Sequence, residues 1–63
     1  MQKVVCINER NSSKLIEVGN TYFIDPSSIS GDSNGDWYVD VYTNSQKEMW
    51  IGYFRLSHFK TVV

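Results

Sequence analysis

Residues 36–55 read DWYVDVYT, then the polar turn NSQK, then EMWIGYFR. Both flanks alternate and are rich in Val, Ile, Tyr, Phe and Trp, the residues that are enriched in β-strands. Two such runs joined by a short polar segment are the sequence form of a β-hairpin. The stretch therefore predicts two antiparallel strands, and the other segments are interpreted around them.

The register of this hairpin decides which side chains share a face. Pairing Asn44 with Lys47, or Thr43 with Glu48, gives the same register, and side chains then alternate between the two faces. One face, predicted to point inward, carries Trp37, Val39, Val41, Trp50, Gly52 and Phe54. The other face, predicted to point outward, carries Tyr38, Asp40, Tyr42, Met49, Ile51 and Tyr53.

The length and composition limit how large the fold can be and which classes of partner it can bind. With 63 residues, 41% of them hydrophobic, the chain has room for one domain, residues 1–63, around one small core. The net charge is −1 and the six basic residues are scattered, so nucleic acid is only a secondary hypothesis. No apolar run approaches the ~20 residues of a membrane span, and no signal peptide is apparent, so we expect a cytoplasmic protein without membrane contact.

Catalytic and metal-binding groups are sparse. Cys6, the only cysteine, is expected in an inner strand, and His58, the only histidine, in a surface turn. They cannot assemble a zinc site or a nucleophile with its base. Residues 32–36 have the Asp and Asn spacing of a calcium loop, but Trp37 stands where that loop needs Gly. We therefore predict no catalytic residue, no metal site and no cofactor.

The other segments predict three more strands and their connections. The strands are expected over residues 3–8, 21–24 and 59–63. The connections are a polar turn over residues 9–14, a loop over residues 27–35 and a 3₁₀ turn over residues 56–58. Five short strands with too few residues for a sandwich close most easily into a small barrel, so the predicted fold class is all-β.

Several short motifs in this layout resemble the SH3 domain. They are Asp36-Trp37-Tyr38, the run from Gly52 to Phe59 (GYFRLSHF) at the family's Gly-x-Phe/Ile-Pro-x-x-Tyr-Val, and Leu15, Gly19 and Tyr22 upstream. The resemblance implies a five-stranded SH3-like barrel with a 3₁₀ turn before the last strand. The compact form is also similar to small SH3-like proteins of phages and prophages, which implies a phage protein in the host cytoplasm.

Departures from the SH3 pattern argue against recognition of proline-rich peptides. The groove for such peptides uses an aromatic first-strand motif and the Pro and Tyr of the last motif. Here VCINE replaces the first motif, Arg55 stands at the Pro position and His58 at the Tyr position. At most Trp37 and Tyr53 remain of that groove.

The predicted outer face of the hairpin is the strongest candidate for a partner-binding surface, because it is too apolar to meet only water. It carries Tyr38, Tyr42, Met49, Ile51 and Tyr53. Trp37, at the loop mouth, and Arg55 and His58, beside the 3₁₀ turn, are expected to extend it. The alternatives are that residues 15–18 or the other strands of the barrel cover part of this face, that Trp37 packs in the core, and that Arg55 and His58 are simply solvated.

These observations lead us to expect a non-catalytic protein-binding module, an accessory protein of a phage that modulates a host protein. One alternative is single-stranded nucleic-acid binding, in which the tyrosines would stack on bases but no positive groove assists them. A second alternative is a self-associating structural protein, a homodimer whose hairpin faces pair about a two-fold axis. Binding that weakens steeply with added salt would indicate the nucleic-acid alternative. A molecular mass that rises with protein concentration would indicate the homodimer.

Overall fold

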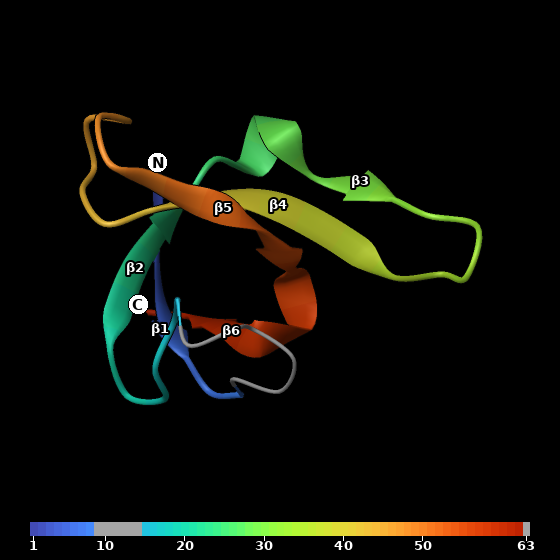
Figure 1. Cartoon of the computed structure of the whole chain (residues 1–63), viewed down its shortest axis with the longest axis horizontal. Coiled ribbons are helices and arrows are strands. Elements are labelled where there is room, and N and C mark those ends of the chain that lie inside the picture. Colours follow the sequence, from blue (N-terminus) through green and yellow to red (C-terminus); the bar gives the residue numbers. More distant parts are fainter. Residues whose placement is uncertain (9–14, 63) are drawn as a thin grey trace.

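The computed structural model describes residues 1–8 and 15–62, which form an all-β fold (Figure 1). Its strands are β1 (Gln2–Cys6), β2 (Thr21–Ile24), β3 (Ser30–Gly31), β4 (Trp37–Tyr42), β5 (Trp50–Arg55) and β6 (Phe59–Thr61). The fold also contains two 3₁₀ helices, η1 (Pro26–Ser28) and η2 (Leu56–His58). The turn predicted over residues 9–14 and the end of the last predicted strand, Val63, lie outside the described residues.

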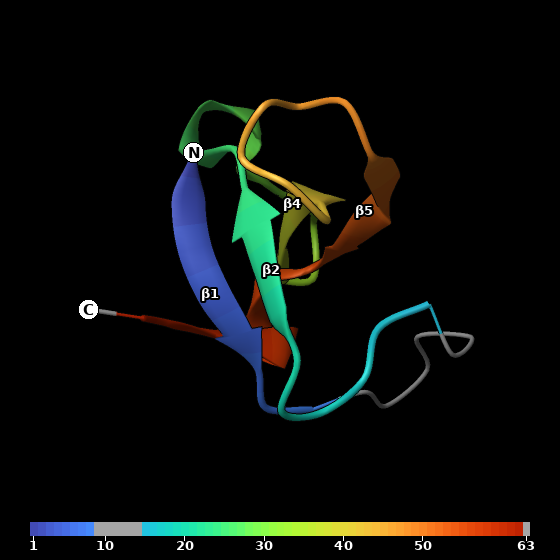
Figure 2. The same cartoon turned by 90° about the vertical axis from the view of Figure 1, so that its left-hand side faces the viewer.

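The strands form one antiparallel sheet in the order β3-β4-β2-β1-β6, and β5 pairs with β4. β4 is its central strand, because it pairs with β5 along one edge and with β2 and β3 at opposite ends of the other. The sheet bends so that β3, β4 and β5 lie across the top of Figure 1, with β1, β2 and β6 below. Figure 2 shows β1 and β2 side by side.

The predicted five-stranded closed barrel is wrong in two respects. The sheet has six strands, and it stays open because no ladder joins β5 to β6 among the described residues. These strands are connected through η2, the 3₁₀ turn that the sequence predicted, which redirects the chain between them. The chain continues from η2 into β6, which pairs with β1.

The sixth strand, β3, lies in the segment predicted as an irregular loop. The carboxylate Oδ1 of Asp32 accepts hydrogen bonds from the backbone N–H groups of Asn34 at 2.8 Å and Asp36 at 3.0 Å. Gly35 follows with a φ of 86°, a left-handed conformation that suits glycine. This turn folds residues 30 and 31 back against the start of β4 and so places Gly31 opposite Trp37.

Alternating side chains of several strands form the core. Its buried members are Val4, Cys6, Ile16, Tyr22, Ile24, Val39, Val41, Phe54 and Phe59. The predicted inward positions of Val39, Val41 and Phe54 are confirmed, as is the burial of Cys6, which is a free thiol. Ile16, from the segment before β2, is completely buried, whereas its neighbour Leu15 is exposed.

The hairpin of β4 and β5 differs from the predicted register. Val39 pairs with Phe54 and Val41 with Gly52, two residues further along β5 than expected. A shift of two keeps the faces of these residues unchanged. Between Val41 and Tyr42, however, the ladder is interrupted by a β-bulge, and Tyr42 pairs with Trp50. The bulge therefore exchanges the faces of Trp50 and its neighbour Ile51.

Candidate functional site

The outward side of the hairpin carries a cluster that we call the outer hairpin face. Its members are Tyr38, Asp40 and Tyr42 of β4 and Trp50 and Tyr53 of β5. Trp50 and Tyr53 are the most exposed of them, at 59% and 49%. The remaining members are partly buried. Large aromatic side chains therefore stay in contact with solvent along the length of the hairpin.

A chain of contacts orders one end of this face. The rings of Tyr38 and Tyr53 stack with centroids 5.5 Å apart and planes 17° from parallel. The Tyr53 hydroxyl is hydrogen-bonded to the Ser30 hydroxyl of β3, and Arg55 Nε donates to the Tyr38 hydroxyl at 3.3 Å. This hydrogen bond and the Asp36 carboxylate, 3.6 Å from Arg55, raise the pKa of the guanidinium above its usual range. Contacts from three strands thus fix the two tyrosines.

Asp40 and Trp50 form the other end of the face. The Trp50 indole Nε1 donates a hydrogen bond of 3.2 Å to Asp40 Oδ1. The backbone of Asp40 is held separately, because its N–H donates to Ser28 Oγ at 3.0 Å. Among the described residues, no Lys or Arg pairs with the Asp40 carboxylate. Within the part of the chain that the structure describes, the carboxylate therefore lies beside Trp50 and Tyr53 without an ion pair, and Lys47 interacts with it electrostatically without direct contact.

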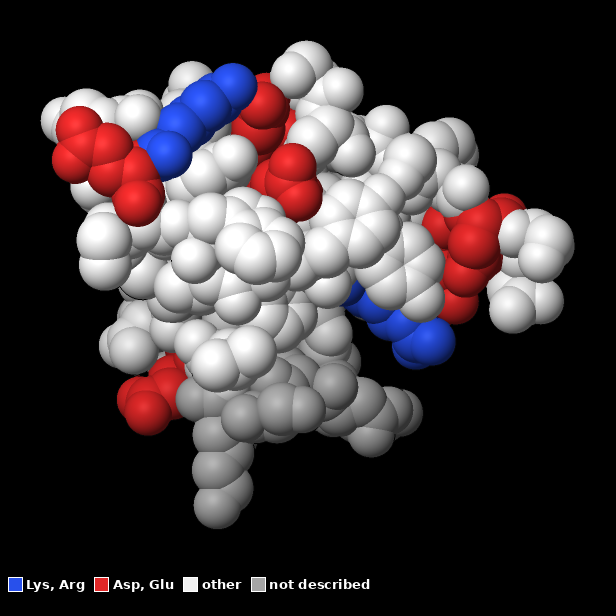
Figure 3. All heavy atoms as spheres, turned by 45° about the horizontal axis from the view of Figure 1, so that its top comes forward, with Lys and Arg blue, Asp and Glu red and all other residues white. Residues whose placement is uncertain are grey.

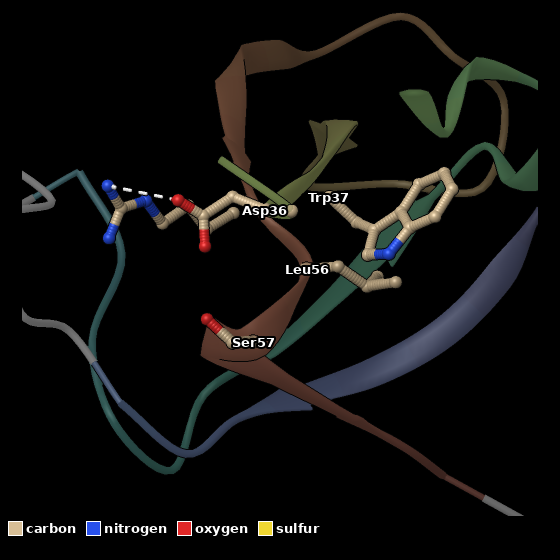
Figure 4. A pocket seen from close by; sticks show the side chains of 6 residues that line it. Asp36, Trp37, Leu56 and Ser57 are labelled. Atoms are coloured by element: carbon tan, nitrogen blue, oxygen red, sulfur yellow. Dashed lines mark ion pairs between the residues drawn. The ribbon is translucent and has the colours of Figure 1, made fainter. Parts of the chain in front are cut away.

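Trp37 lies outside the core, which was one of the two alternatives for this residue, and 56% of its surface is exposed. It begins β4, beyond the core, and its ring lies so close to Gly31 that a Cβ there would be 3.2 Å from a ring carbon. It lines a pocket of about 270 Å³ with Gly35, Asp36, Arg55, Leu56 and Ser57. In Figure 4 the Trp37 indole and Leu56 lie on one side of the pocket, and Asp36 turns toward Arg55.

His58 was predicted to be exposed, either as part of the partner-binding surface or as a simply solvated side chain, and this is wrong. Only 6% of the residue is exposed. Its Nδ1 lies 2.6 Å from the backbone oxygen of Asn8, and its ring meets Phe54 and Phe59 edge-on. Because a carbonyl oxygen only accepts hydrogen bonds, Nδ1 carries the proton. His58 is therefore one of the buried side chains that pack around η2.

The structure brings together only part of the predicted surface. Tyr38, Tyr42 and Tyr53 share the outer hairpin face, with Arg55 at its end, and Met49 is exposed in the turn just before Trp50. Ile51 is partly buried and packs against the core instead. Trp50 is the member that the sequence reasoning missed. Gly52 was the available signal, since glycine inside a strand often marks a bulge.

Within residues 1–8 and 15–62, no three His, Cys, Asp or Glu side chains are grouped so that they could hold a metal ion. In the same ranges, no helix is long and apolar enough to cross a membrane. Comparisons with protein-family models, curated proteins and solved structures gave no match. The resemblance to phage SH3-like proteins therefore stays a prediction.

Proposed function

We propose that this chain is a non-catalytic module that binds another protein through the outer hairpin face. The observation that carries the proposal is the exposure of Trp50 and Tyr53, at 59% and 49%, side by side on a single hairpin. Aromatic side chains are enriched at protein interfaces, and Trp and Tyr are the most frequent sources of binding energy there. Met49, exposed at 57%, adds an adaptable apolar group at the edge of this face.

The order of the face supports the same proposal. Tyr53 is held by its stack on Tyr38 and by the hydroxyl of Ser30, and Trp50 is held by Asp40. Side chains that are already fixed lose less conformational entropy when a partner binds. The face therefore has the properties of a preorganised anchor. A phage or prophage setting, with a host protein as the partner, remains a proposal that rests on the resemblance of the sequence.

Affinity capture from a bacterial lysate tests the proposal. Three forms of the whole chain are used as bait: the wild type, the double variant Trp50→Ser/Tyr53→Ser, and the control Leu15→Ser. Leu15 is 56% exposed and lies outside the hairpin, so its replacement removes a comparable apolar group elsewhere. Circular dichroism first confirms that every bait is folded. The captured protein is then purified, and its affinity for each form is measured by calorimetry.

We expect the double variant to weaken the affinity at least about tenfold, which corresponds to about 1.4 kcal/mol. The control should bind as the wild type does. Equal binding by all three baits would show that the contact surface lies elsewhere. If nothing is captured and the wild type sediments as a dimer that the double variant dissociates, the face is an interface between copies of this chain, and the proposed function is wrong.

A further inference from the structure

We propose that the outer hairpin face receives a cationic side chain, a Lys or an Arg of the partner protein, which lies against Trp50 and Tyr53 and ion-pairs with Asp40. The inference rests on the proposed function and adds the chemistry of the partner. It is carried by the distribution of charge, by the Asp40 carboxylate, which has no ion pair among the described residues, and by the rings beside it.

Charge is distributed unevenly along the chain. Residues 25–55, which include the whole hairpin, contain five acidic and two basic residues, a net charge of −3. The other residues contain four basic and two acidic ones, a net charge of +2. Figure 3 shows acidic groups spread among the uncharged atoms on the side turned to the viewer, with fewer basic groups. Such a surface favours the approach of a positively charged partner.

Both basic residues of the hairpin segment are already engaged. Lys47 Nζ lies 2.7 Å from Asp25, and Arg55 contacts Asp36 at 3.6 Å as well as the Tyr38 hydroxyl. These two ion pairs neutralise acidic groups at the margins of the outer hairpin face. Lys47 also attracts Asp40 electrostatically but makes no ion pair with it, so the Asp40 carboxylate, within the face, can still accept a charge supplied from outside.

The geometry around Asp40 suits a long cationic side chain. Tyr53 is the direct cross-strand partner of Asp40, and Trp50 donates its indole N–H to Oδ1. An ionised carboxylate has about four acceptor positions, so the single bond from Trp50 leaves acceptor capacity for an ammonium or guanidinium group. Aromatic rings next to that position attract the same cation through their electron-rich faces, and they cover its apolar stem.

Two other occupants fit this face less well. A second copy placed on it by a two-fold axis would bring two Asp40 carboxylates toward each other, and two like charges repel at a dry interface. A nucleic acid would bring phosphates to a segment of net charge −3. A partner with Lys or Arg among apolar side chains is the occupant whose charge and apolar groups both match.

The first test uses two probe peptides with blocked ends, one of alternating Leu and Arg and one of alternating Leu and Glu. Each is titrated into the ¹⁵N-labelled chain, and the Trp50 indole N–H and the hairpin amides are followed by NMR. We expect the Arg peptide, and not the Glu peptide, to shift these signals. Asp40→Asn keeps an oxygen acceptor for the indole and should lower the affinity for the Arg peptide at least about tenfold.

The matched control is Glu17→Gln, which removes the same charge from an exposed residue outside the hairpin and should leave the affinity within about twofold of the wild type. Equal shifts with both peptides, no shift with the Arg peptide, or an unchanged affinity in Asp40→Asn would each overturn the inference. A thymidine oligonucleotide is titrated separately, and the inference would also be overturned if it shifted these signals while the Arg peptide did not.

A second measurement separates this inference from the proposed function. The partner obtained by affinity capture is titrated with Asp40→Asn and with Trp50→Ser/Tyr53→Ser. Loss of binding in both variants supports the cationic contact. Loss only in the double variant overturns the cationic contact and leaves the outer hairpin face as the binding surface. Unchanged binding in both variants overturns both proposals.

Discussion

Trp50 and Asp40 are joined across the β4–β5 hairpin by a hydrogen bond of 3.2 Å from the indole Nε1 to Oδ1. The bond exists because the β-bulge beside Tyr42 turns Trp50 to the outward side of the sheet. The largest side chain of β5 is therefore outside the core, although simple alternation places it inside. This position determines what its replacement costs.

We expect Trp50→Ser to leave the domain folded, with a loss of less than about 1 kcal/mol in the free energy of unfolding, because an exposed hydrogen bond contributes little. A Trp inside the core would cost about 3–5 kcal/mol. Urea unfolding measures the difference. Ile16→Ala is the positive control, since Ile16 is completely buried and its truncation should cost about 2–5 kcal/mol. A loss for Trp50→Ser as large as that for Ile16→Ala would contradict the outward position.

Hydrophobic alternation predicted the inner face correctly at Val39, Val41 and Phe54 and failed at Trp50 and Ile51. The reason is that alternation assumes an uninterrupted ladder, whereas a bulge adds one residue to one strand and exchanges the faces beyond it. A sequence shows a bulge only indirectly. Here Gly52, in the middle of an otherwise apolar strand, was the single indication.

Other parts of the fold depend on contacts that no local pattern contains. The partner of His58 is the backbone oxygen of Asn8, 50 residues away in the sequence. The turn that creates β3 depends on one carboxylate, that of Asp32, which accepts two backbone hydrogen bonds. The same Asp residues had suggested a weak calcium motif. Residue types thus indicated a polar loop correctly, but they did not reveal that its side chains organise a strand.

Gly52 has a φ of 149°, and a Cβ added to it would lie 2.8 Å from the buried ring of Phe54. We expect Gly52→Ala to lower the free energy of unfolding by about 2–4 kcal/mol, because backbone strain and overpacking add. Gly19→Ala is the matched control, since Gly19 also has a positive φ but has no atom within 4 Å of the added Cβ. Denaturant unfolding should show the larger loss for Gly52→Ala. Equal losses would mean that the Phe54 ring moves aside without cost.

The short contact from His58 Nδ1 to the Asn8 oxygen predicts which ring nitrogen carries the proton. In the neutral ring we expect a proton on Nδ1 and none on Nε2. Long-range ¹H–¹⁵N correlation spectra at alkaline pH distinguish the two tautomers directly. Tyr22→Phe serves as a control, because it removes a hydroxyl bonded to the Glu17 backbone and leaves His58 and its acceptor in place. A dominant Nε2–H tautomer would contradict the arrangement around η2.

The Lys47–Asp25 ion pair predicts a loss of stability in acid. Hydrogen bonds from Lys47 and then from Ser27 lower the pKa of Asp25 from 3.8 to about 2. Because the folded-state pKa lies below the unfolded value, this stabilisation is fully present above pH 3.8 and disappears as the pH falls toward 2. Thermal unfolding across this range should therefore show the wild type losing its advantage over Asp25→Asn. Glu17→Gln, measured in parallel, accounts for the general effect of removing one acidic group. A difference between wild type and Asp25→Asn that stays constant through the range would contradict the ion pair between Lys47 and Asp25.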